Sequence, residues 1–189
     1  MDPPEEWPTE IRELYDPIRI LGKGGFASVV LARAKTVNSD NKKNKVAIKV
    51  VGGIQEAGIH LSAAEIKEQR DRAVLYARRE IEILNHVQHH NIVRLYHHWM
   101  SESEDDNESE TKNGQKEDLT AAVLVLEYAK GPTVESLLKH GGALSTNFGR
   151  IVIAQTIDAI AYLHSRAVLH RDIKPDNILG KQLDLSLLR

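Results

Sequence analysis

Apolar and polar positions recur with two different periods along this chain, and each period predicts its own kind of element. Short β-branched runs at 29–32 and 46–49 predict strands, and so does the apolar run at 121–128, which ends in polar residues. Residues 63–87 are charged, contain no proline or glycine, and carry apolar residues near helical spacing. This segment predicts a long helix that ends around Asn85-His86.

Helical patterns continue in the last third of the sequence. Thr133 can cap a short helix that runs through Leu138, with Glu135 well placed in its first turn. Residues 148–164 then place isoleucine, alanine and leucine on one broad apolar face, which predicts a buried helix.

Composition bounds the class of protein that carries these elements. The chain has 189 residues, of which 41% are hydrophobic and 28% charged, as expected for a soluble globular protein with its own core. It contains no cysteine, which excludes structural disulfides and thiolate metal sites. An acidic, proline-rich start without a signal-peptide pattern, and the lack of an apolar run of about 18 residues, predict no membrane association. We expect a cytoplasmic protein, with the nucleus as the alternative.

The net charge of −2 is unevenly distributed. The segment 101–118 contains eight acidic residues and two lysines, so it carries −6 and leaves about +4 on the remainder. It has no aliphatic residue, which favours a solvated insert over a packed element. Loop closure tolerates such length because its entropic cost rises slowly, and a docking or phosphorylation role for its serines is the alternative.

The strongest chemical signal is the string His170-Arg171-Asp172-Ile173-Lys174-Pro175-Asp176-Asn177. It resembles the catalytic loop of eukaryotic protein kinases, H-R-D-[LI]-K-x-x-N. The lysine two places after the aspartate is the serine/threonine-kinase form of this loop.

Two upstream motifs agree with this resemblance. Residues 21–29, Leu-Gly-Lys-Gly-Gly-Phe-Ala-Ser-Val, predict a strand, a phosphate-covering turn and a second strand, and Val46-Ala47-Ile48-Lys49 matches the family's lysine strand. We expect Gly22 and Gly24 to take positive φ and to let backbone amides approach phosphate oxygens. The third glycine of G-x-G-x-x-G is Ala27 here. A Rossmann dinucleotide site needs a helix directly after the glycines, whereas this sequence continues as a β-rich run.

The resemblance implies an α+β, bilobal kinase-like fold with a five-stranded N-lobe and its helix, followed by only the first part of the helical C-lobe. We expect an N-terminal extension at 1–17 and a partial kinase domain at 18–189. Within it, the N-lobe covers about 18–128, including the acidic insert at 101–118, and the partial C-lobe covers 129–189.

The resemblance also implies ATP and Mg²⁺ as cofactors and a serine or threonine of a protein as the substrate, with no direct nucleic-acid partner. It assigns Asp172 to orient the acceptor hydroxyl and take its proton, Lys174 to neutralise the transferring phosphoryl, and Asn177 to bind magnesium. Lys49 would contact the α and β phosphates and be held by Glu80, while Leu126 guards the back of the pocket. The remaining expected nucleotide contacts are Leu21, Gly22, Gly24, Val29, Ala47, the Glu127 carbonyl, the Ala129 amide and Leu179.

Five histidines lie between His86 and His98 and raise the question of a metal site. We favour an ordinary helix-to-strand turn, because metal ligands need convergent geometry that sequence alone does not show. The following string, 91–99, before the acidic insert, is also similar to kinases that act on a translation initiation factor.

The sequence contains no Asp-Phe-Gly triplet, which in the family binds a second magnesium, and Asp184-Leu185-Ser186 does not replace it. Two functions remain open at this stage. The chain is the N-terminal portion of an active serine/threonine kinase, or it is a catalytically inactive kinase-like module that binds a partner. We expect no measurable phosphoryl transfer from the 189 residues alone, and an apolar face of the 148–164 helix left in water.

Overall fold

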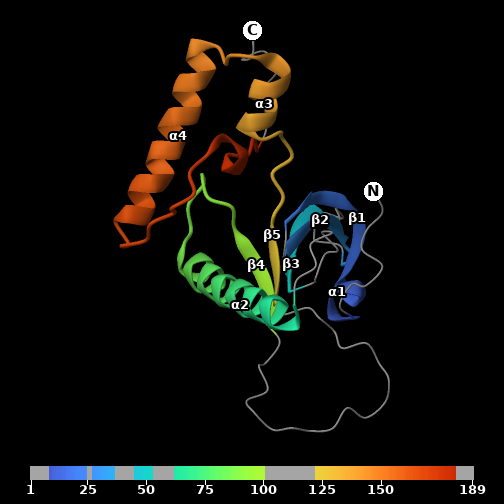
Figure 1. The fold of residues 1–189 in the computed structure, drawn as a ribbon. Coiled ribbons are helices and arrows are strands. Elements are labelled where there is room, and N and C mark those ends of the chain that lie inside the picture. Colours follow the sequence, from blue (N-terminus) through green and yellow to red (C-terminus); the bar gives the residue numbers. More distant parts are fainter. Residues whose placement is uncertain (1–8, 25–26, 37–44, 53–61, 101–121, 182–189) are drawn as a thin grey trace, which may run out of the picture. The chain divides into compact units, whose positions relative to one another are not determined.

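In a computed structural model, the residues described are 9–24, 27–36, 45–52, 62–100 and 122–181. The chain divides into two compact units, and Figure 1 shows the elements of each. The first unit takes in 1–82 and 95–127, and the second takes in 83–94 and 128–189.

The first unit contains a five-stranded antiparallel sheet. Its strands are β1 (Tyr15–Lys23), β2 (Ala27–Ala34), β3 (Lys45–Val51), β4 (Leu95–Met100) and β5 (Ala122–Glu127), in the order β1-β2-β3-β5-β4. The strand that follows the glycines confirms that this is not a Rossmann unit, because β2 pairs directly back onto β1.

Side-chain alternation gives this sheet two apolar faces. Val30, Ile48 and Val125 point to one face and pack with Ile11 and Tyr15. The preceding helix α1 (Thr9–Leu14) supplies Ile11, which is fully buried. This helix was not predicted from the sequence.

Helix α2 (Ala63–His86) covers the other face. Its Ala77 and Ile81 pack with Val51, Ala122 and Leu124. The predicted span and end of this helix are confirmed.

The start of α2 is fixed by a reciprocal pair of bonds. The backbone amide and hydroxyl of Ser62 donate to a Glu65 carboxylate oxygen at 2.8 and 2.7 Å, and the Glu65 amide donates back to the Ser62 hydroxyl at 3.3 Å. This is a capping box, and these bonds hold the pKa of Glu65 below its usual value.

The second unit is helical. It contains α3 (Val134–Gly141), α4 (Thr146–His164) and a short 3₁₀ turn, η1 (Pro175–Asn177). Thr133 caps α3 through a bond from the Ser136 amide, as predicted, although the helix continues to Gly141 instead of ending at Leu138.

The predicted burial of α4 is wrong for most of its length. Phe148 and Leu163 are its buried residues, whereas Ile153 and Ile157 are 61% and 59% exposed. Burial of an apolar face depends on which other elements cover it, and helical periodicity alone does not supply them. The expected exposed apolar face is therefore present. Among the described residues, no helix combines the length and apolarity needed to cross a bilayer.

Candidate functional site

In the first unit, Lys49 and Glu80 form an ion pair. The Lys49 Nζ lies 2.5 Å from a Glu80 carboxylate oxygen, and both side chains are about a third exposed or less. The pair follows from local periodicity, because Lys49 alternates with buried Ile48 and so points to the sheet face that α2 covers. The pairing expected from the sequence is present.

Cross-strand register aligns other predicted residues with Lys49. Val29 lies opposite Lys49, and Gly22 lies opposite Val29, so the three occupy one row across β1, β2 and β3. Ala47 pairs with Leu126 in the next row of the same face. Opposed residues of antiparallel strands share a face, so an apolar surface beside the lysine is built into the sheet.

In the glycine-rich segment, Leu21 and Gly22 belong to β1, and one backbone bond joins Gly24 to Ala27. The Gly24 amide donates to the Ala27 carbonyl at 2.7 Å. The expectation of positive φ at Gly22 and Gly24 is wrong, because among the described glycines only Gly52 and Gly142 have it. Gly22 is instead held in extended strand pairing. A Cβ on Gly22 would meet no atom within 4 Å, so this glycine leaves open space above the strand.

In the second unit, three residues of the predicted catalytic loop make a compact cluster. Asp172 accepts from Lys174 Nζ at 2.9 Å and from Asn177 Nδ2 at 2.8 Å, both through the same carboxylate oxygen. Asn177 Nδ2 also donates to the Asp172 backbone carbonyl at 2.8 Å. The short 3₁₀ turn at 175–177 brings the asparagine back to the aspartate.

This cluster favours the ionised form of Asp172. Hydrogen bonds from Lys174, and then from Asn177, hold the pKa of the Asp172 carboxyl below its usual value. His170 adds a further constraint, because its Nδ1 accepts from the Asp172 backbone amide at 3.3 Å. Arg171 between them has φ of 64°, a conformation that costs a non-glycine residue about 1–3 kcal/mol and is concentrated at functional sites.

The backbone near the expected hinge packs against the end of the catalytic segment. The Gly131 amide donates to the Gly180 carbonyl at 2.6 Å, and Thr133 forms an isolated β-bridge with Leu179. A Cβ at Gly131 would collide with the Gly180 backbone. The Gly180 carbonyl is the atom that Gly131 approaches. Leu179 is 46% exposed, so it is available to a ligand and is not a core residue.

The structure therefore forms two clusters from the predicted site residues. Glu127, at the end of β5, lies in the unit of Lys49, and Ala129 lies in the unit of Asp172. His170 was missed as a positioning residue, although it belongs to the quoted motif. Asp158 was also missed. In the sequence, Asp158 is an isolated acidic residue within the apolar run of α4, and this was the one feature that distinguished it. Its contacts are described below.

Two expectations concern residues outside those that the structure describes. The acidic insert at 101–118 is one, and Asp184-Leu185-Ser186 is the other.

Comparison with known proteins gives a consistent picture. A family model described as "Protein kinase domain" matches residues 15–187. Aurora kinase C of Mus musculus is 34% identical over 161 residues, which are 85% of this chain and 46% of that protein. CBL-interacting serine/threonine-protein kinase 24 of Arabidopsis thaliana is 33% identical over 165 residues, covering 87% of this chain and 29% of that protein.

Among solved structures, Rad53 in complex with AMP-PNP aligns with a TM-score of 0.63 and 26% identity, covering 94% of this chain and 37% of that chain. This chain thus spans less than half the length of each of these three proteins. With the lysine–glutamate pair, the Asp172 cluster and the five-stranded sheet in place, the chain belongs to the protein kinase domain family.

Proposed function

We propose that this chain provides the nucleotide-binding strands and the catalytic loop of an ATP-dependent serine/threonine protein kinase. The observation that carries the proposal is that both charged clusters of such a site are formed, one from Lys49 and Glu80 and one from Asp172, Lys174 and Asn177. The similarity to serine/threonine kinases and to a kinase solved with AMP-PNP supports the same reaction class.

In this proposal the first unit holds most of the nucleotide. Lys49, fixed by Glu80, contacts the α and β phosphates, while Leu21, Gly22 and Gly24 cover them. Val29 and Ala47 contact the adenine from one side, and the Glu127 carbonyl and Ala129 amide form its hydrogen bonds. Leu179 closes the other side of the base. The convergence of the two units on one nucleotide is part of the proposal.

Asn177 fits the expected role of a magnesium ligand. Its Nδ2 is engaged by Asp172, which leaves the carboxamide oxygen for a cation. Mg²⁺ prefers such hard oxygen ligands, and when bound it would neutralise charge on the phosphates.

Asp172 is suited to hold the acceptor hydroxyl. Like an ordinary aspartate it is a carboxylate at neutral pH, and the lowered pKa favours this form further, so it can accept a hydrogen bond from a serine or threonine hydroxyl. A low pKa makes a weak base, which assigns the carboxylate mainly to orientation and leaves proton uptake late in the reaction. Lys174, already 2.9 Å from Asp172, would place its charge beside the phosphoryl group.

The residues proposed to bind the nucleotide all lie in this chain, so nucleotide affinity tests the proposal. Calorimetry with ATP in the presence and absence of Mg²⁺ measures this affinity. Lys49→Met is expected to weaken binding by about 10–100-fold, since hydrogen bonds to charged groups are worth about 1.5–3 kcal/mol. Asn177→Ala should remove most of the magnesium dependence. Lys139→Met removes an exposed lysine of α3 and is the control. The proposal fails if wild type binds no ATP, or if Lys49→Met and Lys139→Met bind it equally well.

The substrate is a proposal that follows from the family, and the location is a proposal that follows from composition. We propose protein serine or threonine hydroxyls as acceptors, and the cytoplasm as the location. An inactive, partner-binding module would be favoured instead by a wild-type chain that folds but does not bind nucleotide.

A further inference from the structure

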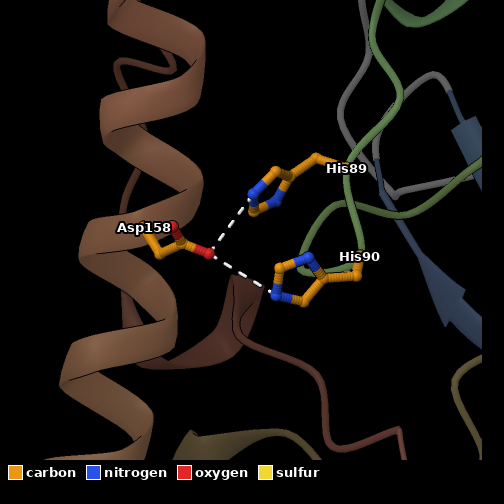
Figure 2. Close-up of side chains that lie close together, drawn as sticks. All are labelled: His89, His90 and Asp158. Atoms are coloured by element: carbon orange, nitrogen blue, oxygen red, sulfur yellow. Dashed lines mark ion pairs between the residues drawn. The ribbon is translucent and has the colours of Figure 1, made fainter.

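Two histidines of the loop after α2 converge on one acid of α4. The Nε2 atoms of His89 and His90 lie 3.2 and 3.5 Å from the same Asp158 carboxylate oxygen, and Figure 2 shows both rings turned toward it. All three residues belong to the second unit. None of them takes part in the nucleotide or catalytic clusters described above.

The spacing matches that of a metal site. Zinc binds imidazole nitrogen and carboxylate oxygen at about 2.0–2.1 Å, so neighbouring ligand atoms in a tetrahedral site are about 3.3 Å apart. The two nitrogen-to-oxygen distances bracket this value, and the ligand atoms of the three residues all lie within 4.8 Å of one another. The convergence that sequence analysis could not show for these histidines is therefore present.

Neighbouring residues already position part of this three-residue cluster without a bound ion. The His89 ring lies against Tyr162 and stacks on the His90 ring, with centroids 4.7 and 4.4 Å apart, and its side chain is only 12% exposed. The Tyr162 hydroxyl accepts from the Gln88 amide at 2.9 Å, which ties the same loop to α4. His90 and Asp158 are 74% and 52% exposed, so an ion can enter from solvent.

One residue competes with a metal for these atoms. The Asn91 side-chain amide lies 3.1 Å from both His90 Nε2 and the Asp158 carboxylate, and its backbone amide donates to His89 Nδ1 at 3.3 Å. Binding an ion moves the His89 proton to Nδ1 and displaces these long contacts. Competition of this kind lowers the affinity without removing the site.

We propose that His89, His90 and Asp158 form a zinc-binding site with three protein ligands and water as the fourth. Two imidazoles and one carboxylate suit a borderline divalent transition ion, and they do not suit Mg²⁺ or Ca²⁺, which take oxygen ligands. The bound ion would join the loop at 87–94 to α4, linking His90 to Asp158 across 68 positions of sequence.

A competition titration with a fluorescent zinc chelator tests the site on the untagged full chain, in excess Mg²⁺. The decisive variant is His90→Gln, because this exposed side chain can be replaced without disturbing folding. Asp158→Asn removes the carboxylate and keeps its shape. His98→Gln removes an exposed histidine of β4 and is the matched control.

Wild type and His98→Gln should each bind one zinc ion with the same dissociation constant. His90→Gln and Asp158→Asn should bind at least about tenfold more weakly, since even outer partners of zinc ligands change affinity 10–100-fold. Zinc should raise the melting temperature of wild type and the control, and raise that of His90→Gln less. Equal zinc affinity in wild type and His90→Gln, or no zinc bound by wild type, overturns the proposal.

Discussion

Glu80→Gln separates the two roles that the Lys49–Glu80 pair can have, in stability and in nucleotide binding. The substitution keeps the shape of the side chain and removes its charge, so the Lys49 ammonium, now 2.5 Å from the carboxylate, loses its partner. A role limited to stability predicts a change in unfolding alone. A role in the site predicts a larger change in ATP affinity.

The exposure of the pair sets the expected magnitudes. Because Lys49 and Glu80 are 28% and 34% exposed, solvent screens much of their attraction, and the expected loss of stability is at most about 1 kcal/mol. This corresponds to a decrease in melting temperature of about 2–4 °C for a chain of this size. A released lysine must be immobilised again to contact phosphate, which costs about 1.5–2 kcal/mol of side-chain entropy. ATP affinity should therefore fall by about tenfold.

Calorimetry with Mg·ATP and thermal unfolding measure these two effects on the same protein. Asp71→Asn is the control, because it removes an exposed carboxylate from the same helix. The reasoning is refuted if Glu80→Gln binds ATP as tightly as Asp71→Asn does, or if Glu80→Gln unfolds the protein without affecting nucleotide binding in the folded fraction.

Three further predictions test local features of the fold and the site. Ser62→Ala should lower the free energy of unfolding, measured in urea, by about 1 kcal/mol, because it removes the N-cap of α2. Gly131→Ala should lower the free energy of unfolding by about 1–3 kcal/mol, because the added Cβ clashes with the Gly180 backbone. Gly149→Ala should not destabilise the protein, because Gly149 lies in a helix with open space around its Cβ position. In carboxyl NMR titrations, Lys174→Met should raise the pKa of Asp172 toward its usual value. The pKa of Asp172 is lower in the folded protein than in the unfolded chain. The stabilisation from the Asp172–Lys174 pair is therefore complete at pH values above the unfolded-state pKa, and it is lost as the pH falls through the folded-state pKa. An unchanged Asp172 titration would contradict the assignment.

Local patterns predicted several strands and the long helix, whereas the five-stranded sheet was predicted through the resemblance to kinases. The β-branched run that predicted the Lys49 strand is buried at five of the strand's seven positions, and the 63–87 pattern predicted α2 and its end near His86. Such features are set by residues a few positions apart, so a single sequence contains them. The pairing of Glu80 with Lys49 was instead predicted through the resemblance to kinases.

Features that depend on residues distant in sequence were not predicted. Helix α1 has six residues, too few to show a period, and its place is fixed by burial of Ile11 in the core of the sheet. Asp158 meets His90 across 68 positions of sequence, and no local pattern records that contact.

The resemblance to kinases that act on a translation initiation factor stays a prediction, since it concerns a substrate. The convergence of Lys49 with the Asp172 cluster on one nucleotide also stays a prediction, and it is the central claim of the proposed function.

An ATP analogue with an acyl group on its terminal phosphate tests that claim most directly. A lysine amine close to this phosphate attacks the acyl carbon, forms an amide and releases ATP, and peptide mass spectrometry locates the modified residue. Lys49 and Lys174 should both be acylated faster than exposed Lys139, and excess Mg·ATP should protect both. Acylation of Lys49 or Lys174 at the rate of Lys139, without protection by ATP, would contradict the account.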